Sequence, residues 1–218
     1  MTKSELDPRA ERGSSSSSSK TKHDARLVVC LTGMPGAGKS TAAQMSLTVG
    51  FEVFRMGDDV RFEAERRKLS QTDENLGALM LELRQAGGPA AIAHLCEQRI
   101  EKSGRSKYVL VDGIRNMNEF LEFKKLGRAV LVSIHGSPQT RFKFLQSRAR
   151  GDSPRNFQAF EARDRRELSV GIGEAIALAD QVIVNSGSIE DLENSAADLL
   201  KNEKETFDKN QLSRDPSY

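Results

Sequence analysis

The sequence predicts an α/β fold, a five-stranded parallel sheet with helices on both faces and right-handed crossovers. Apolar runs of strand length alternate with stretches of helical spacing along the chain, which is the order that βαβ units produce. Two of these runs, Leu27–Leu31 and Tyr108–Val111, are continuous in apolar residues, as is typical of strands covered on both faces. With 218 residues, 37% of them hydrophobic, the chain can fill the core of one such domain.

Start and stop signals divide the chain into elements. Thr72 is a suitable N-cap, Gly87-Gly88-Pro89 ends the helix that it begins, and Pro138 stands at an early helix position. The expected strands are Leu27–Leu31, Phe51–Met56, Tyr108–Gly113, Arg128–Ile134 and Gln181–Val184. The expected helices are Ser40–Leu47, Asp59–Leu69, Thr72–Ala86, a helix ending near Glu101, Gln139–Arg148, a helix after the turn at Gly151–Pro154, Gly173–Leu178 and a last helix from Ser188 to about Lys201.

A glycine-rich stretch joins the first predicted strand to the first predicted helix. Such a turn directs successive backbone N–H groups inward, so that they form a nest for phosphate oxygens at the positive end of a helix. The pattern Gly33-x-x-x-x-Gly38-Lys39-Ser40 is that of a P-loop, in which the lysine bridges the β- and γ-phosphates of ATP and the hydroxyl binds Mg²⁺. The expected nucleotide-binding residues are Gly33, Met34, Pro35, Gly36, Ala37, Gly38, Lys39, Ser40 and Thr41.

Two carboxylates and an arginine follow the second predicted strand. Asp58, Asp59 and Arg61 stand at the carboxyl end of that strand, where open α/β sheets bind ligands. We therefore expect a ligand there, and either aspartate could orient or deprotonate an acceptor hydroxyl. In the alternative interpretation one aspartate caps the following helix and Arg61 is solvated.

The third predicted strand ends in an acid. Asp112 follows Tyr108–Val111, which is the Walker B position relative to the upstream P-loop. We expect Asp112 to hold Mg²⁺ or its water, with Ser40 as the direct ligand. Arg115, three residues further on, would face the same crevice.

Basic residues are concentrated between Arg141 and Arg166, where eight arginines and lysines stand against three acids. The excess is centred on the turn Gly151–Pro154 between two predicted helices. This pattern predicts a lid whose guanidinium groups fold over the phosphates and neutralise developing charge; a solvated helix hairpin is the alternative. The proposed lid arginines are Arg148, Arg150 and Arg163.

Composition limits the other function classes. The 33 basic and 31 acidic residues give a formal net charge of +2, and with 6% aromatic residues and no tryptophan a nucleic-acid partner is not expected. No apolar run approaches the length of about 20 residues that spans a bilayer, and the two cysteines form no CxxC pair. We expect a cytoplasmic protein that is not bound to a membrane.

Both ends of the chain differ from the middle in composition. Residues 1–25 are polar and contain six consecutive serines at 14–19, so we expect a disordered tail. A flexible polar tail is likewise expected over 201–218. The predicted domain then spans 26–200, with its lid at about 148–166.

Taken together, these motifs resemble the nucleoside monophosphate kinase superfamily across about residues 26–200. Gly57-Asp58-x-x-Arg61 looks like adenylate kinases, which implies that Arg61 grips the acceptor phosphate. Ala179-Asp180-x-Val-Ile-x-Asn185-x-Gly187 looks like dephospho-CoA kinases, which implies that Asn185 lies beside the donor adenine. The whole chain is most similar to an archaeal family of small kinase-like P-loop proteins that is grouped near dephospho-CoA kinase.

The resemblance implies an ATP- and Mg²⁺-dependent phosphotransferase that acts on a nucleotide-like acceptor, either dephospho-CoA or a nucleoside monophosphate. Lys39, Asp58 or Asp59, Asp112 and the lid arginines would act on the reacting groups, while Arg61 and Arg115 would bind the acceptor. Asp112-Gly113-Ile114-Arg115 departs from the Asp-Gly-Phe-Pro-Arg of adenylate kinases, so the acceptor stays open. The alternative is a nucleotide-dependent ATPase switch or binding module without a small-molecule acceptor.

Overall fold

A computed structural model describes residues 26–104, 106–147 and 153–213 of the chain. The strands are β1 (Leu27–Thr32), β2 (Glu52–Arg55), β3 (Tyr108–Ile114), β4 (Arg128–His135) and β5 (Gln181–Val184). The helices are α2 (Lys39–Val49), α3 (Met56–Arg66), α4 (Asp73–Gly87), α5 (Ala91–Ser103), α6 (Met117–Lys124), α7 (Pro138–Ser147), α8 (Phe157–Ser169), α9 (Ile172–Ala177) and α10 (Ile189–Leu212).

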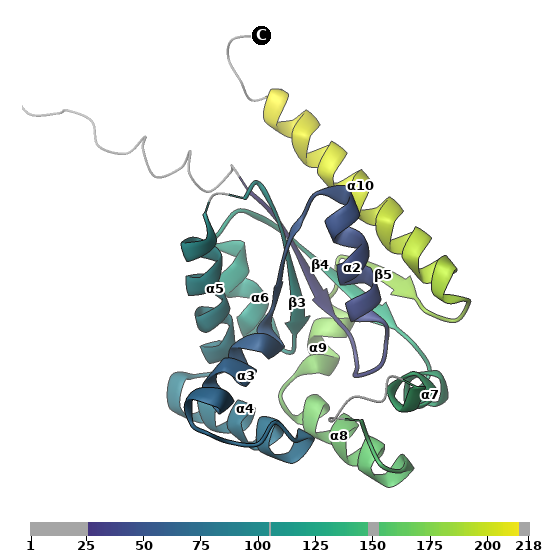
Figure 1. The fold of residues 1–218 in the computed structure, drawn as a ribbon. Helices are drawn as coiled ribbons and strands as arrows, with labels where there is room; N and C mark the ends of the chain where they lie inside the picture. The colour runs from purple at the N-terminus through teal and green to yellow at the C-terminus, as the bar shows by residue number, and fades with distance from the viewer. Residues whose placement is uncertain (1–25, 105, 148–152, 214–218) are drawn as a thin grey trace, which may run out of the picture.

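The strands form one parallel sheet in the order β2-β3-β1-β4-β5, as Figure 1 shows. The predicted five-stranded parallel sheet is thereby confirmed. Strand β1 lies at its centre and pairs with β3 on one side and β4 on the other. The connection after β1 leads to β2 at one edge of the sheet, and the connection after its neighbour β4 leads to β5 at the other edge. A crevice opens at the carboxyl ends of two adjacent strands whose connections leave in opposite directions.

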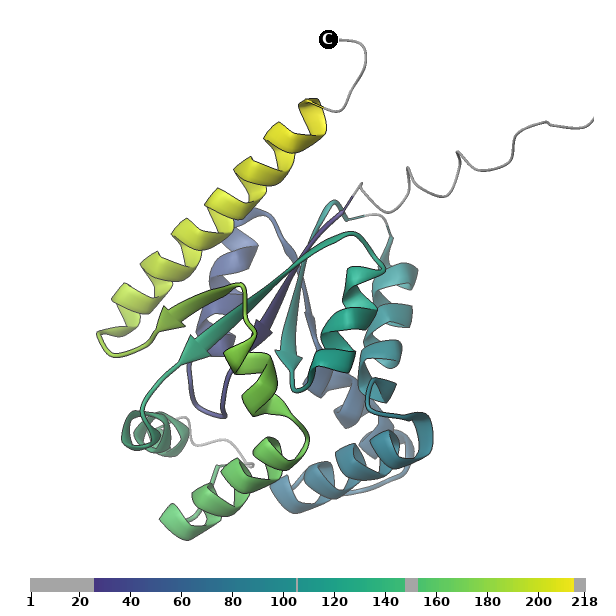
Figure 2. The same cartoon turned by 180° about the vertical axis from the view of Figure 1, so that it is seen from behind.

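Helices cover both faces of the sheet because its central strand is apolar on both sides. Val28 and Cys30 face a core formed with α3, α4, α5, α6 and α9. Leu27, Val29 and Leu31 face a second core under α2 and α10. The two layers are seen from opposite sides in Figures 1 and 2. Helices α7 and α8 instead lie at the carboxyl edge of the sheet, below the arrowheads in Figure 1, and α4 reaches the same edge.

The last helix corrects the expectation of a flexible tail from residue 201. Helix α10 continues to Leu212 because its inward face continues: Phe207 is buried and packs edge-on to Tyr108, with ring centroids 6.4 Å apart. The Tyr108 hydroxyl donates to Asp208 at 2.7 Å, and Lys204 Nζ donates to the carbonyl oxygen of Val49 at 2.9 Å. These contacts fasten the end of α10 to the amino edge of the sheet.

One further helix and one further helix start also differ from those predicted. Helix α6 was not predicted, although Asn116 caps it by accepting a hydrogen bond from the backbone N–H of Glu119 at 2.9 Å. Helix α3 begins at Met56 rather than at Asp59, so the second strand is correspondingly shorter. This earlier start changes which side chains of α3 face the carboxyl edge.

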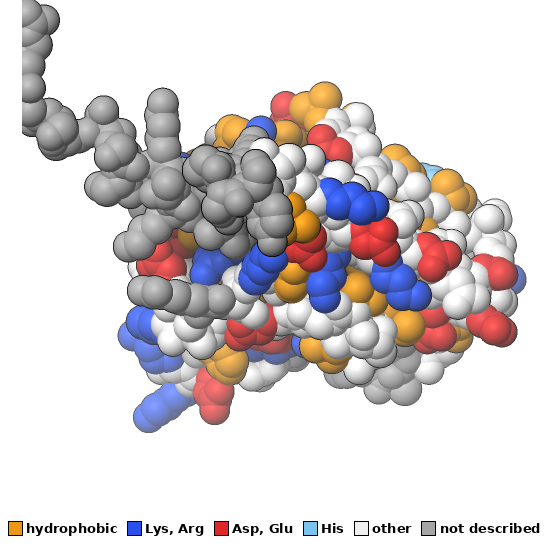
Figure 3. All heavy atoms as spheres, turned by 90° about the horizontal axis from the view of Figure 1, so that it is seen from above, with side chains coloured by type: hydrophobic (Ala, Val, Ile, Leu, Met, Phe, Trp, Pro, Cys, Tyr) orange, Lys and Arg blue, Asp and Glu red, His pale blue; other side chains and the backbone are white. Residues whose placement is uncertain are grey.

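The end of the molecule opposite that edge carries charges of both signs. Figure 3 views this end from above, and its lysine and arginine side chains are interspersed with aspartate and glutamate. Within the parts of the chain that the structure describes, no helix is long and apolar enough to cross a membrane. The predicted tail at residues 1–25 lies outside the described residues.

Candidate active site at the carboxyl edge of the sheet

The loop between β1 and α2 has the shape that its glycines were expected to allow. Gly33, Gly36 and Gly38 have φ angles of 138°, 80° and 109°, which side chains with a Cβ rarely adopt. A Cβ on Gly33 would also stand 2.3 Å from the carbonyl oxygen of Ile134, and one on Gly36 would stand 2.6 Å from that of Arg141. Neighbouring backbone therefore packs directly against the outside of the loop and fixes its curvature.

Lys39, at the first position of α2, folds back over this loop. Its Nζ donates to the carbonyl oxygens of Gly33 at 2.6 Å and Met34 at 3.3 Å. Removal from water lowers the pKa of Lys39 to about 8, against the opposing attraction of Asp112. The ammonium group is thus held inside the loop, ready to exchange weak carbonyl partners for phosphate oxygens.

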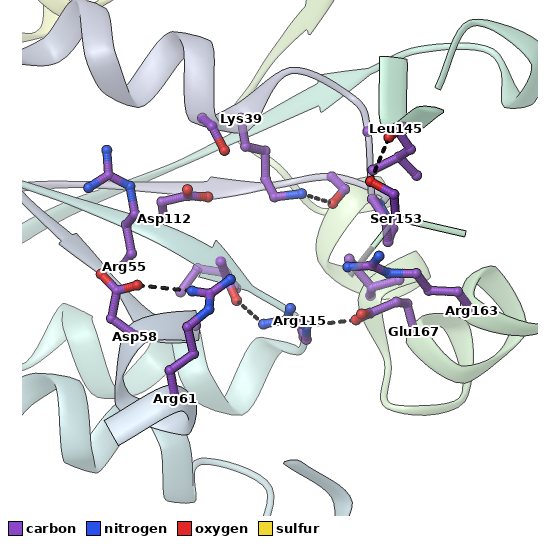
Figure 4. A pocket seen from close by; sticks show the side chains of 18 of the residues that line it. Lys39, Arg55, Asp58, Arg61, Asp112, Arg115, Leu145, Ser153, Arg163 and Glu167 are labelled. Atoms are coloured by element: carbon purple, nitrogen blue, oxygen red, sulfur yellow. Dashed lines mark hydrogen bonds and ion pairs between the residues drawn. The ribbon is translucent and has the colours of Figure 1, made fainter. Parts of the chain in front are cut away.

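A cavity of about 590 Å³ extends from the P-loop toward α3 and α8. Figure 4 shows side chains from the P-loop, β2, α3, β3 and α8 converging on it. The charged residues that line it are Lys39, Arg55, Asp58, Arg61, Asp112, Arg115, Arg163 and Glu167. Cations outnumber carboxylates in this set, which suits an anionic occupant.

Asp112 lies at the carboxyl end of β3, and its neighbour across the sheet in β2 is Arg55. Asp112 and Ser40 both line the cavity, and a carboxylate and a hydroxyl are hard oxygen donors of the kind that Mg²⁺ prefers. Among the described residues no group of three or more histidine, cysteine, aspartate or glutamate side chains could hold a metal ion by itself. The donor set therefore fits an ion that also takes oxygens from a bound phosphate chain, as Mg²⁺ does in nucleotide sites.

The two aspartates at the start of α3 are separated by the structure. Asp58 lines the cavity and pairs with Arg61 at 3.0 Å. Asp59 does not line it: its buried carboxylate accepts a hydrogen bond from Arg99 Nη2 of α5 at 2.9 Å. Burial raises the pKa of Asp59, and Arg99 opposes that rise. The expectation that Asp59 faces the acceptor is therefore wrong, and Asp59 instead joins α3 to α5.

Arg115 faces the cavity as expected, but with a partner that sequence reasoning missed. Its Nε donates to Glu167 of α8 at 2.6 Å, and the backbone N–H of Arg115 donates to the buried carboxylate of Glu119 at 2.7 Å. Burial raises the pKa of Glu167, but Arg115 and Arg163 outweigh it, so that the pKa lies below its ordinary value. Glu167 is thus an anion that fixes the direction of the Arg115 guanidinium.

Helices α7 and α8 lie against the P-loop through a buried arginine. Arg141 of α7 donates from Nη1 to the carbonyl oxygen of Pro35 at 3.1 Å and pairs through Nη2 with Asp164 of α8 at 2.6 Å. Its guanidinium also stacks on Phe160, 4.9 Å from the ring centroid. Arg141 therefore connects the P-loop to α8 rather than facing the cavity.

Of the three predicted lid arginines, the structure describes only Arg163. Arg163 of α8 lines the cavity and also pairs with Asp73 at the start of α4. Arg148 and Arg150 lie outside the described residues, and their contact with phosphate stays a prediction.

Only some of the other predicted nucleotide-binding residues line the cavity. Gly33, Pro35 and Gly36 line the cavity, whereas Met34, Ala37, Gly38, Thr41 and Asn185 do not. The buried amide of Asn185 donates to the carbonyl oxygen of Ala37 at 2.9 Å. Asn185 thus supports the outside of the P-loop, and a contact with adenine stays a prediction.

The residues of the site region that were missed include Arg55, Asp73 and Glu167. Arg55 carried the plainest signal, since it ends β2 directly before Met56-Gly57-Asp58. Glu167 stands four residues after Arg163 and therefore shares a helix face with it. Asp73 gave no signal beyond its place in the first turn of a helix, because its partners are 90 or more residues away along the chain.

Comparison with known proteins places this geometry in a family. A family model described as an AAA domain matches residues 32–161. A UPF0200 protein of Hyperthermus butylicus is 42% identical over 175 residues, covering 80% of this chain and 94% of that protein. A UPF0200 protein of Methanocaldococcus jannaschii is 44% identical over 176 residues, covering 80% and 89%. The chain belongs to the UPF0200 family.

The fold of this UPF0200 protein is also found among solved kinases. A shikimate kinase from Bacteroides thetaiotaomicron superposes with a TM-score of 0.57 at 16% identity, covering 80% of this chain and 98% of that chain. At this level of identity the likeness concerns the fold alone. The expected resemblance to small kinase-like P-loop proteins is confirmed, and the sheet, the P-loop and the covering helices are those of a P-loop NTPase fold.

Proposed function

We propose that this UPF0200 protein is an ATP-dependent phosphotransferase that acts on a nucleotide-like acceptor with an anionic group. The observation that carries the proposal is one shared cavity, in which the P-loop Lys39 and the arginines Arg61, Arg115 and Arg163 converge from α2, α3, the loop after β3 and α8. A P-loop supplies the donor side of such a site, and a group of arginines supplies the acceptor side. The fold shared with a shikimate kinase supports phosphoryl transfer to a small molecule.

Each residue of the cavity has a role in this proposal. Lys39 binds the β- and γ-phosphates, and its charge follows the phosphoryl group as it leaves. Ser40 and Asp112 would hold Mg²⁺, which neutralises charge on the bridging phosphate oxygens when it is bound. Arg61 and Arg115 bind the anionic group of the acceptor, and Arg163 balances charge that spreads over the transferring oxygens.

The acceptor can be a nucleoside monophosphate or dephospho-CoA. Asp58 lines the cavity and could orient a ribose hydroxyl, which dephospho-CoA would require. A monophosphate would need no base, because its acceptor oxygen is already ionised. ADP release from ATP should therefore be measured with a panel of acceptors that includes AMP, CMP, UMP and dephospho-CoA.

Two substitutions test the roles within the best acceptor reaction. Arg61→Ala should raise the acceptor KM most, because the acceptor's anion is charged before and during transfer. Arg163→Ala should mainly lower kcat, because its partner charge develops in the transition state. Arg66→Ala is the matched control, since Arg66 is on the same helix as Arg61 but is 72% exposed and paired with Glu63. If no acceptor stimulates ATP turnover, the nucleotide-dependent switch becomes the better explanation.

A further inference from the structure

A single carboxylate holds the lid helix α8 against α4. Asp73, in the first turn of α4, pairs through Oδ2 with Arg166 Nη2 at 2.6 Å and through Oδ1 with Arg163 Nε at 3.3 Å. The side chains are only 27%, 23% and 15% exposed, respectively. One oxygen for each arginine is the arrangement in which an acid bridges two cations.

Helix α4 is shaped to receive Arg166. A Cβ on Gly77, in the middle of α4, would stand 2.8 Å from Arg166 Nε and 2.9 Å from its Cζ. Glycine in a helix interior costs about 1 kcal/mol relative to alanine, and here the missing methyl group is the space that the guanidinium fills. Arg166 Nε is buried against α4 without a hydrogen-bond partner among the residues that the structure describes, so the guanidinium is held there by packing as well as by Asp73.

Asp73 and both arginines line a small second cavity of about 70 Å³ beside the main one. This space is much smaller than the main cavity of about 590 Å³, so it suits a small charged group better than a nucleoside. The charged residues that line it are Arg61, Asp73, Arg115, Arg163, Arg166 and Glu167. Four cations against two carboxylates leave an excess of two positive charges, which a phosphate dianion would balance.

We propose that Asp73 is a positioning residue that acts as an internal counter-anion: it holds Arg163, Arg166 and hence α8 in place. The phosphate group of the acceptor takes its place beside Arg166, which leaves Arg163 for the charge that develops on the transferring oxygens. The identity of that phosphate as part of the acceptor rests on the proposed function. A phosphate group has more oxygens and more charge than a carboxylate, so it can satisfy the same arginines more fully. The side chain of Asp73 thereby keeps the two arginines oriented while no acceptor is bound.

The proposal predicts a chemical rescue that can be followed by hydrogen exchange in the full chain. Asp73→Asn removes the charge at nearly constant shape, and amide exchange in α8 should become about fivefold faster, the change that a partly exposed ion pair typically produces. Inorganic phosphate should restore slow exchange in α8 of this variant, and chloride at equal ionic strength should not. Asp73→Glu keeps the charge and should behave like the wild type.

Two further variants make the test specific. Glu82→Gln removes an acid from the same helix, one that pairs with Arg67 outside both cavities, and it should leave exchange in α8 unchanged. Arg166→Gln should also speed exchange in α8, but phosphate should not reverse it, because one of the two bridged cations is gone. Phosphate that binds only in the P-loop would act alike on Asp73→Asn and Arg166→Gln.

The proposal is overturned if amide exchange in α8 is equally fast in Asp73→Asn and Glu82→Gln. It is also overturned if phosphate slows exchange in neither Asp73→Asn nor Arg166→Gln, or in both of them. This experiment uses no ATP and no acceptor turnover. A successful rescue in a protein that phosphorylates no acceptor would therefore refute the proposed function and leave the role of Asp73 intact. Acceptor phosphorylation without a rescue by phosphate would support the proposed function and refute the role of Asp73.

Discussion

Nucleotide binding should weaken as the pH rises from 7 to 9, because Lys39 loses its proton in the empty protein. Burial holds the pKa of this lysine at about 8, whereas 10.5 is its ordinary value. A bound phosphate chain favours the charged form and should return the pKa to at least the ordinary value. Below pH 8 Lys39 is protonated in both the empty and the nucleotide-bound protein, whereas above pH 8 it is protonated only in the bound protein. Binding above pH 8 therefore takes up a proton, and the affinity for the nucleotide falls as the pH rises.

The two pKa values of Lys39, about 8 and 10.5, also give the size of the expected change in affinity. ATP affinity should fall about tenfold between pH 7 and pH 9, and binding at pH 8 should take up about half a proton. The second pKa of phosphate esters is about 6, so the ligand is mostly ionised already at pH 7 and contributes little over this range. Titration calorimetry in buffers of different ionisation enthalpy measures both quantities.

A Lys39→Arg variant is the control, because its guanidinium stays charged throughout the range. Its affinity for ATP should not change with pH between 7 and 9. Wild-type affinity that is equally flat would show that Lys39 is fully protonated in the empty loop. The same slope in Lys39→Arg would assign the titration to another group.

Three other substitutions test separate parts of the structure. Asp112→Asn should reduce Mg²⁺-dependent activity far more than nucleotide binding, since an amide cannot balance the charge of the ion; equal activity of both proteins across a Mg²⁺ titration would remove Asp112 from the site. Asp59→Ala should cost about 2 kcal/mol of stability by leaving Arg99 without its carboxylate, with kcat unchanged; a loss of kcat at full stability, seen in urea unfolding and steady-state kinetics, would return Asp59 to the catalytic set. Phe207→Ala should lower the free energy of unfolding by about 3–4 kcal/mol, because the ring is buried under α10; a change below 1 kcal/mol in urea unfolding would mean that the end of α10 is not packed as described.

Short-range patterns were enough to predict the sheet and the P-loop. The continuous apolar run before Gly33 and the acid after Val111 each depend on neighbours in sequence, and the structure places both as expected. The choice between Asp58 and Asp59 depended instead on where α3 begins. Consecutive residues of a helix are turned by about 100°, so only one of the two aspartates can face the cavity, and the three-residue error in the helix start obscured which.

Pairings between distant segments account for most of what was missed in the site. Glu167 meets Arg115 across 52 residues, and Asp73 meets Arg166 across 93, distances over which a single sequence carries no local signal. The end of α10 is a different case. Leu200, Glu203 and Phe207 are buried at helical spacing, and this spacing was available in the sequence.

Arg141 joins the two parts of the site that are proposed to bind the nucleotide and the acceptor. One guanidinium contacts the carbonyl oxygen of Pro35 in the P-loop and the carboxylate of Asp164, the neighbour of Arg163 in α8. A phosphate chain that shifts the P-loop would therefore also shift the helix that reaches the second cavity. Under such coupling each substrate changes the affinity of the other by the same factor, whichever binds first. The two dissociation constants of this protein should then be measured as a linked pair, each with the other site empty and filled.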